Sequence, residues 1–252
     1  MIPKIIHYCW FGRAPLPKLA KKCIRSWKKY MPGYQIKLWN EDNFDVNCCQ
    51  YTADAYKEKK YAFVSDYVRF YVIYQQGGIY LDTDVELIKP LDKILKDGPF
   101  MGRESMADKD VFDVAPGLGI GAEAGMSFYK EMIDLYNGIS FYNNDGSLNL
   151  KTVVSYTTEK FKEHGLYDVD SIIEVCGIKI YPKDYFCPID YKTRKRHFTT
   201  NTVSIHHYVG SWIDKPLLIS FRNWLLRILG ETTYNRLRYA KLLIMPKPWK
   251  WG

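Results

Sequence analysis

The spacing of apolar residues along the chain switches repeatedly between the period of a helix and that of a strand. In the segment 62–76, aromatic residues recur at spacings of three and four, which is typical of one helix face: Phe63, Tyr67, Phe70, Tyr71 and Tyr74. Residues 34–39 alternate as a half-buried strand does. The same reading predicts helices at 19–31, 53–61, 128–136 and 155–163, and strands at 1–6, 79–81, 99–102, 178–182 and 202–206.

Alternating strands and helices favour an α/β sandwich around a mainly parallel central sheet. At 252 residues, the chain is long enough to bury one substantial core. The segment 115–122 carries glycines at 117, 119 and 121, which is too glycine-rich for an ordinary strand and predicts close approach of its backbone to another group. A dinucleotide-binding fingerprint is not favoured there, because no matching helix start and later acid follow.

The stretch 75–86 holds the main candidate chemistry. A helical pattern ends at a glycine pair, a short apolar strand follows, and Asp82 and Asp84 come at its end. Residues i and i+2 of an extended chain share one face, roughly 6.6 Å apart at about 3.3 Å per residue, and Tyr80 lies on that face too. Two aspartates so placed can converge on Mg²⁺ or Mn²⁺, which often bridge a protein to phosphate oxygens.

Asp66 and Arg69 are neighbours on the preceding predicted helix, where they form either a surface ion pair or part of a site. Together with the Asp82-x-Asp84 block, the pattern Ala62-x-x-Ser65-Asp66-x-x-Arg69 resembles the sugar-binding "DXD" region of glycosyltransferase family 32. The resemblance extends to residues 2–12, 34–42 and 206–212, so it spans about residues 2–213.

The resemblance implies a GT-A-type nucleotide-sugar fold and a metal-dependent, retaining glycosyltransferase. Asp84 would bind Mn²⁺ or Mg²⁺ directly, and Asp82 would act partly through water and sugar hydroxyls. His207 looks like a further metal ligand, whereas His206 is expected to be a strand-end histidine bonded within the core. Trp10 looks like the ring that stacks on the nucleotide base, with a core tryptophan as the alternative.

The remaining roles also come from the resemblance. Asp66 and Arg69 would hold the transferred sugar, Tyr80 would contact sugar or phosphate, and Ser211 and Trp212 would close over the diphosphate. The donor would be a nucleotide-sugar, with UDP-hexose favoured, and the acceptor a glycan or lipid-linked glycan of capsule, lipopolysaccharide or exopolysaccharide synthesis. The sequence offers no clear general base, which a retaining mechanism accommodates.

The net charge of +8 is concentrated after residue 214. The segment 215–252 holds eight Lys or Arg residues and one acid, and its apolar residues recur at helical spacings. We therefore expect a catalytic domain at 1–214 and a basic amphipathic helical tail at 215–252, which binds an anionic membrane surface or packs on the domain. No signal peptide or membrane span is evident, so a cytoplasmic protein, peripheral on the inner face of the membrane, is expected. Nucleic-acid binding is not favoured.

Two other function classes stay open. The block Leu81-Asp82-Thr83-Asp84-Val85 also resembles the nucleophile motif of aspartyl-phosphate phosphohydrolases, although that motif usually lies on an N-terminal strand. A non-catalytic carbohydrate- or membrane-binding protein on a transferase fold is the second class. The six cysteines show no metal-ligand spacing and are expected to be free thiols.

Overall fold

A computed structural model of the chain describes residues 1–105, 112–169, 171–189 and 196–209. Ser211, Trp212 and the expected tail at 215–252 lie outside the described residues. Within the described ranges, no helix combines the length and the apolar character that crossing a bilayer requires.

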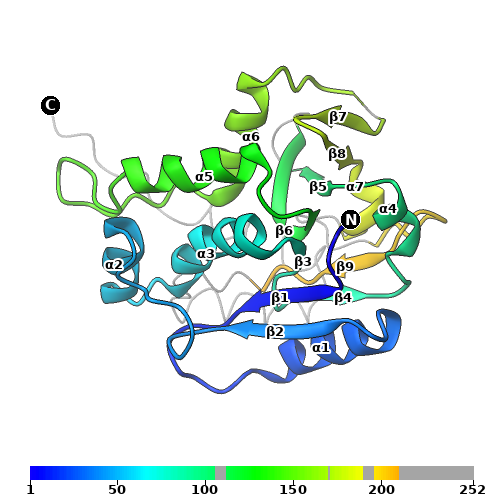
Figure 1. Cartoon of the computed structure of the whole chain (residues 1–252), viewed down its shortest axis with the longest axis horizontal. Coiled ribbons are helices and arrows are strands. Elements are labelled where there is room, and N and C mark those ends of the chain that lie inside the picture. Colours follow the sequence, from blue (N-terminus) through cyan, green and yellow to red (C-terminus); the bar gives the residue numbers. More distant parts are fainter. Residues whose placement is uncertain (106–111, 170, 190–195, 210–252) are drawn as a thin grey trace, which may run out of the picture. The chain divides into compact units, whose positions relative to one another are not determined.

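A seven-stranded sheet forms the centre of the fold (Figure 1). Its order is β2-β1-β3-β6-β5-β8-β7. The strands are β1 Ile5–Cys9, β2 Gln35–Trp39, β3 Gly78–Tyr80, β5 Phe100–Ser105, β6 Phe112–Ala122, β7 Ile173–Val175 and β8 Ile178–Tyr181. β1 pairs in parallel with β2 and β3, and β5 with β8, whereas β6 and β7 pair antiparallel to their neighbours. The prediction of an α/β fold with a mainly parallel sheet is confirmed, with β6 and β7 reversed.

Helices cover both faces of this sheet. They are α1 Lys18–Tyr30, α2 Gln50–Lys57, α3 Tyr61–Gln76, α4 Asp92–Lys96, α5 Ser127–Gly138, α6 Val153–Glu163 and α7 Lys183–Phe186. α2, α3, α5 and α6 share one hydrophobic cluster with Tyr80, and α3 and α5 lie side by side (Figure 1). α1, α4 and α7 share the other cluster with Ile79 and Leu81. The alternation of these three residues between the two clusters shows that β3 is buried on both faces.

A second, two-stranded sheet pairs β4 Val85–Leu87 with β9 Ser204–His206 in antiparallel fashion. The side chains of α1 fix β4 in place. Trp27 donates its indole N–H to the Val85 carbonyl at 2.8 Å, and the Leu87 N–H donates to Ser26 Oγ at 2.9 Å. The small sheet therefore brings a segment from the far end of the described chain against the residues that follow β3.

The glycine pair between α3 and β3 is required by its backbone and surroundings. Gly77 and Gly78 have φ of 62° and 99°, and a Cβ on Gly78 would lie 2.8 Å from the Ile5 carbonyl oxygen. The Gly77 carbonyl accepts from His7 Nε2 at 2.9 Å, while Trp39 donates its indole N–H to His7 Nδ1 at 3.0 Å. Burial lowers the pKa of His7 to about 4, so the ring is neutral when it holds this turn.

The glycine-rich segment predicted to approach another group forms most of β6. It is a strand with an irregularity, because the register against β5 jumps from Ile120 opposite Met101 to Ala115 opposite Gly102. Residues 116–119 are thereby left out of the ladder with β5, and Gly117 lies within this interruption. The sequence pattern missed four short elements, β4, α4, β7 and α7, each of five residues or fewer.

Candidate active site

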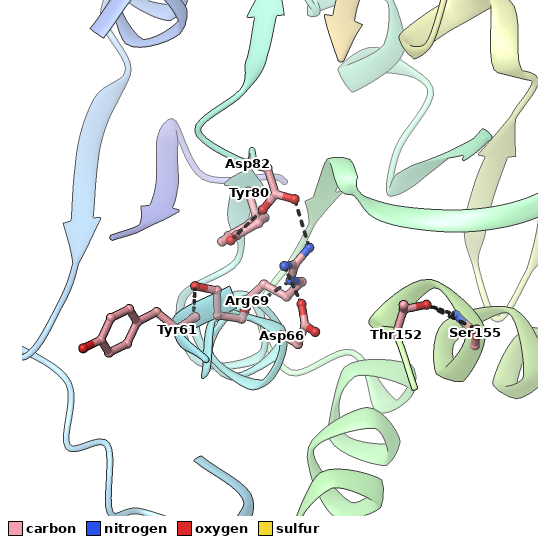
Figure 2. A network of polar contacts seen from close by, with 8 residues as sticks. Tyr61, Asp66, Arg69, Tyr80, Asp82, Thr152 and Ser155 are labelled. Atoms are coloured by element: carbon pink, nitrogen blue, oxygen red, sulfur yellow. Dashed lines mark hydrogen bonds and ion pairs between the residues drawn. The ribbon is translucent and has the colours of Figure 1, made fainter. Parts of the chain in front are cut away.

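Arg69 lies between two carboxylates at the end of β3 where the chain leaves the sheet (Figure 2). Its Nη2 is 2.7 Å from Asp66 Oδ1, and its Nη1 is 3.4 Å from Asp82 Oδ2. Nε donates to the Ser65 carbonyl at 3.2 Å, and the guanidinium lies 5.0 Å from the centre of the Tyr80 ring. The side chain of Arg69 is only 4% exposed and that of Asp66 10%, so they do not form a surface ion pair.

The charges of this group oppose the effect of its burial. Burial raises the pKa of Asp66 to about 7, although the Arg69 cation acts in the opposite direction. For Arg69, burial alone would favour the neutral form, but the negative charges of Asp82 and Asp66 outweigh it and raise its pKa. Arg69 is therefore a permanent cation, while Asp66 changes its charge near neutral pH.

The backbone of β6 completes the surroundings of Asp82. The Asp82 N–H donates to the Gly117 carbonyl at 3.1 Å, and Asp82 Oδ1 accepts from the Tyr80 hydroxyl at 3.0 Å. A Cβ added to Gly117 would lie 2.1 Å from Asp82 Oδ2 and 3.2 Å from Arg69 Nη1. The close approach predicted for the glycine-rich segment is thus made to Asp82 and Arg69.

Asp84 is held by residues from the other end of the described chain. Its Oδ1 is 3.3 Å from His206 Nε2, and its Oδ2 accepts from the Val209 N–H at 2.9 Å. Burial by itself would raise the pKa of Asp84, but the His206 ring and the Val209 N–H lower it to about 2. Burial alone would lower the pKa of His206, whereas Asp84 and the more remote Glu104 raise it to about 9. The two residues form an ion pair in which each side chain is 16% exposed.

The two adjacent histidines have different partners. His206, expected to bond within the core, is the one that contacts Asp84. His207, expected to be a metal ligand, has its Nε2 2.9 Å from Glu86 Oε2, which also accepts from Lys22 Nζ at 2.7 Å. Partial burial opposes ionisation of Glu86, but the hydrogen bonds from Lys22 and His207 lower its pKa. Sequence reasoning missed Glu86 and Lys22, and the i+2 spacing of Asp84 and Glu86 was the available signal.

The donors suit a divalent cation only if a substrate supplies further oxygens. Among the described residues, no cluster of three or more His, Cys, Asp or Glu side chains is arranged to hold a metal ion. Asp82 and Asp84 provide hard carboxylate oxygens, and Asp82 is 29% exposed. Mg²⁺ typically binds through one or two carboxylates together with substrate phosphates. The pair therefore fits an ion that is bound jointly with a diphosphate.

Sequence reasoning also missed a buried carboxyl on β5. Glu104 is 7% exposed, and burial raises its pKa, while the charge of His206 and a hydrogen bond with Tyr208 act against this rise. Tyr208 has a positive φ of 52° and its ring lies 4.3 Å from that of His206. Only the three-dimensional fold brings this strand to the histidine motif.

Trp10 follows β1 directly, at the same edge of the sheet as the end of β3. It is partly exposed, and its indole N–H donates to the Ala14 carbonyl at 2.6 Å. The ring is thus fixed by its edge, and it is not part of the buried core. Ser211 and Trp212, the expected closing residues, lie outside the described residues.

Comparison with known families identifies the region that carries these residues. Residues 17–101 match the family described as the glycosyltransferase sugar-binding region containing a DXD motif. The matched segment includes Asp66, Arg69, Asp82 and Asp84. The resemblance noted from the sequence is confirmed for this region.

Curated relatives carry similar names. Inositol phosphoceramide mannosyltransferase 3 of Schizosaccharomyces pombe is 30% identical over 102 residues, which are 37% of this chain and 27% of that protein. The uncharacterized glycosyltransferase L373 of Acanthamoeba polyphaga mimivirus is 34% identical over 106 residues, 40% of this chain and 42% of that protein. The chain thus matches less than half the length of each relative.

A solved structure also resembles this fold at a distance. It is a glycosyltransferase involved in the glycosylation of the major capsid of PBCV-1, with a TM-score of 0.49 and 13% identity. The match covers 82% of this chain and 95% of that chain. A likeness at this level has no bearing on substrate or mechanism.

Proposed function

Because residues 17–101 form a glycosyltransferase sugar-binding region with a DXD motif, we propose that the chain is a metal-dependent glycosyltransferase. It transfers a hexose from a nucleotide-sugar to a glycan or lipid-linked glycan, with retention of anomeric configuration. The observation that carries the proposal is the buried Asp66–Arg69–Asp82 group beside the paired Asp84, at the edge of the sheet where β1 and β3 end. In open α/β sheets, ligands bind beyond the carboxyl ends of the strands.

Each residue has a role that follows from its position. The exposed face of Trp10 stacks on the nucleotide base, Asp66 accepts from hydroxyls of the transferred sugar, and Arg69 offsets phosphate charge. Tyr80 orients Asp82 through its hydroxyl. Asp82 and Asp84 would hold a divalent cation, Mn²⁺ or Mg²⁺, together with the diphosphate, and that cation would supply Lewis-acid stabilisation of the leaving group. For His207 to become a further ligand, its ring has to leave Glu86.

The transfer exchanges one bond at the anomeric carbon for another. The bond from that carbon to the diphosphate oxygen breaks, and its electron pair stays on the diphosphate. The acceptor hydroxyl oxygen bonds to the same carbon from the same face, and its proton passes to the departing phosphate. The Arg69 cation stabilises the charge that develops on that phosphate.

The donor and acceptor classes are proposed from the resemblance and from the relatives. UDP-hexoses are favoured, and GDP-mannose is a further candidate because a similar relative is named a mannosyltransferase. That relative is named after a lipid, inositol phosphoceramide. A lipid-linked acceptor of capsule, lipopolysaccharide or exopolysaccharide synthesis is compatible with that name. We place the enzyme at the inner face of the cell membrane, where the basic segment 215–252 would contact anionic lipid.

Nucleotide release from a panel of sugar donors tests this function. The purified chain is incubated with UDP-glucose, UDP-galactose, UDP-N-acetylglucosamine or GDP-mannose, with Mn²⁺ or with a chelator. Turnover of one donor is expected only with the metal. Asp84→Ala should abolish turnover and Asp82→Ala should nearly do so, whereas Asp134→Ala, which removes an exposed carboxylate on α5, should retain it.

Normal turnover in either site variant would refute the proposal. Hydrolysis of p-nitrophenyl phosphate without turnover of any nucleotide-sugar would instead favour the phosphohydrolase alternative. Binding of sugar donors without any turnover would favour a non-catalytic carbohydrate-binding protein.

A further inference from the structure

Tyrosines from three helices pack together against α3, where the Tyr136 ring lies 6.3 Å from that of Phe70, one helical turn after Asp66. Tyr51 comes from α2, Tyr136 from α5 and Tyr156 from α6. Burial raises the pKa of Tyr51 and Tyr136, and the neighbouring negative charge of Asp66 raises both further. The packing places them near Asp66 too: Tyr136 contacts Phe70, and Tyr51 contacts Phe141, which packs on Phe63. Phe63 and Phe70 are three residues before and four after Asp66, so they neighbour it on one face of α3. Asp66 carries the carboxylate that the proposed function assigns to the sugar.

The hydroxyls of Tyr51 and Tyr136 are buried donors without an acceptor among the described residues. The two residues are 1% and 0% exposed. Their rings meet edge to face at 4.9 Å, and Tyr51 also packs against Phe141 at 5.3 Å. Because these contacts fix both rings, the hydroxyls cannot turn outward to find solvent. Buried hydroxyls in native proteins usually have a partner, and for these two the nearby Asp66 carboxylate offers one.

Asp66 has the complementary feature, a carboxylate oxygen that receives no hydrogen bond from the described residues. Its Oδ1 accepts from Arg69, but in the described part of the chain Oδ2 accepts no hydrogen bond. The charged groups that face Asp66 are Arg69 on its own helix and Asp82 after β3. An acceptor short of donors thus lies near two donors short of acceptors. Bound water joins such groups when each has polar partners on both sides.

We propose that Tyr51 and Tyr136 are positioning residues that hold Asp66 through bound water. Their rigid rings, anchored in α2 and α5, keep the carboxylate directed towards the donor sugar; this role rests on the proposed function, whereas the water-mediated contact does not. Hydrogen bonds donated to a carboxylate favour its ionised form. The two hydroxyls therefore keep Asp66 available as an acceptor for sugar hydroxyls despite its burial.

The chain provides a matched control in Tyr129. Its hydroxyl is equally buried and also lacks a partner, but its raised pKa has burial as the sole cause, with no contribution from Asp66. Tyr129→Phe therefore removes the same group from the same kind of surroundings without affecting Asp66.

The test compares Tyr51→Phe, Tyr136→Phe and Tyr129→Phe in the full chain labelled with ¹³C at aspartate carboxyls. The Asp66 signal is assigned with Asp66→Asn and titrated by NMR. Loss of a hydrogen bond to a charged group should raise the Asp66 pKa by about one unit in the first two variants, and leave it unchanged in Tyr129→Phe. At pH 7 such a rise lowers the ionised fraction about fivefold, so the donor KM should rise by about that factor while kcat changes less.

An unchanged Asp66 pKa in both Tyr51→Phe and Tyr136→Phe would overturn the inference. So would an increase in their melting temperatures equal to that of Tyr129→Phe, because removing a hydroxyl without any partner relieves an unmet hydrogen bond. The NMR titration requires no turnover. A wild-type chain that turns over no sugar donor would therefore refute the proposed function, while the Asp66 titration would still decide the water-mediated contact.

Discussion

Asp82 and Asp84 are separated by one residue, yet the structure holds them in two different ways. The side-chain partners of Asp82, Arg69 and Tyr80, are close in sequence, whereas the main chain of Gly117 approaches from β6. Asp84 is held by His206 and by the backbone of Val209, on and after β9. Both carboxylates thus lie in the turn between β3 and β4, but the main sheet holds one and the small sheet the other.

The two sides therefore differ in how rigidly they hold their carboxylate. The Asp82 side is a dense group in which a fixed cation lies between two carboxylates on a rigid helix and strand. The Asp84 side depends on a three-residue strand pair and on an ion pair formed across it. Sites on well-packed elements keep their geometry, so the Asp82 side is the positioning half of the proposed site. The Asp84 side is the half that is more easily rearranged.

Among the tests of this comparison, the largest effect is expected from Gly117→Ala, which displaces Asp82 by steric means alone. The new Cβ would lie 2.1 Å from Asp82 Oδ2, so the carboxylate or the strand has to move. Because a displacement of about 1 Å in a site can cost about 100-fold, kcat/KM for donor turnover should fall at least about 100-fold. Steady-state kinetics of nucleotide release measures this loss.

Gly138→Ala is the matched control for that variant. Gly138 ends α5 with no atom within 4 Å of an added Cβ, so this substitution should leave activity unchanged. Equal activity of the two variants would mean that Asp82 does not need its position against β6.

A smaller effect is expected when the histidines of the Asp84 side are exchanged separately. His206→Gln removes the charge that pairs with Asp84, and a hydrogen bond between charged groups is worth about 1.5–3 kcal/mol. We expect kcat/KM to fall about tenfold or more, and less in His207→Gln, whose ring contacts Glu86. Kinetics over a range of Mn²⁺ concentrations measures both. A larger loss in His207→Gln, with a raised Mn²⁺ requirement, would show that His207 leaves Glu86 to bind the ion.

The smallest effect concerns stability in acid, which should depend on His7 at the turn between α3 and β3. The folded-state pKa of His7 is about 4, below its ordinary value of 6.5, so its neutral form stabilises the fold. This contribution is complete above pH 6.5 and is lost as the pH falls towards 4. Between pH 7.5 and pH 5 the free energy of unfolding should drop by about 2 kcal/mol from this residue.

Urea denaturation at the two pH values measures the drop, and His7→Gln provides the comparison. Glutamine can still offer a donor and an acceptor to Gly77 and Trp39 but does not take up a proton. The same acid-induced loss in His7→Gln would assign that loss to other groups.

The sequence predicted the Asp82 side much better than the Asp84 side, for a physical reason. Helical spacing places Asp66 beside Arg69, and strand spacing places Tyr80 beside Asp82. Both contacts can therefore be predicted from the local spacing of residues. The pairing of β4 with β9 has no such signature, because each strand has only three residues. Which histidine contacts Asp84 depends on that register, whereas the family resemblance singled out His207 as a metal ligand and implied no contact with Asp84.

For other segments the sequence predicted a feature but not the residues that it contacts. The glycine-rich segment predicted a close approach, but only the interrupted pairing of β5 and β6 shows that Asp82 is the group approached. Tyr51 and Tyr136 lie on separate helices, and nothing in their spacing relates them to Asp66. The long helices and several strands of the main sheet were predicted from period, but not β6, whose glycines argued against an ordinary strand. Contacts between distant segments required the fold.

The small β4–β9 sheet has a consequence for how the chain matures during synthesis. His207 follows its partner Glu86 by 121 residues, and β9 is the last strand described. At about 5–20 residues per second, a ribosome needs about 6–24 s to add that interval. Both aspartates and Arg69 have been made when this interval begins, and the strand that carries Gly117 is made early in it, long before the residues that hold Asp84. A nascent chain can therefore form the Asp82 half first, and the proposed site is complete only when β9 has emerged and paired.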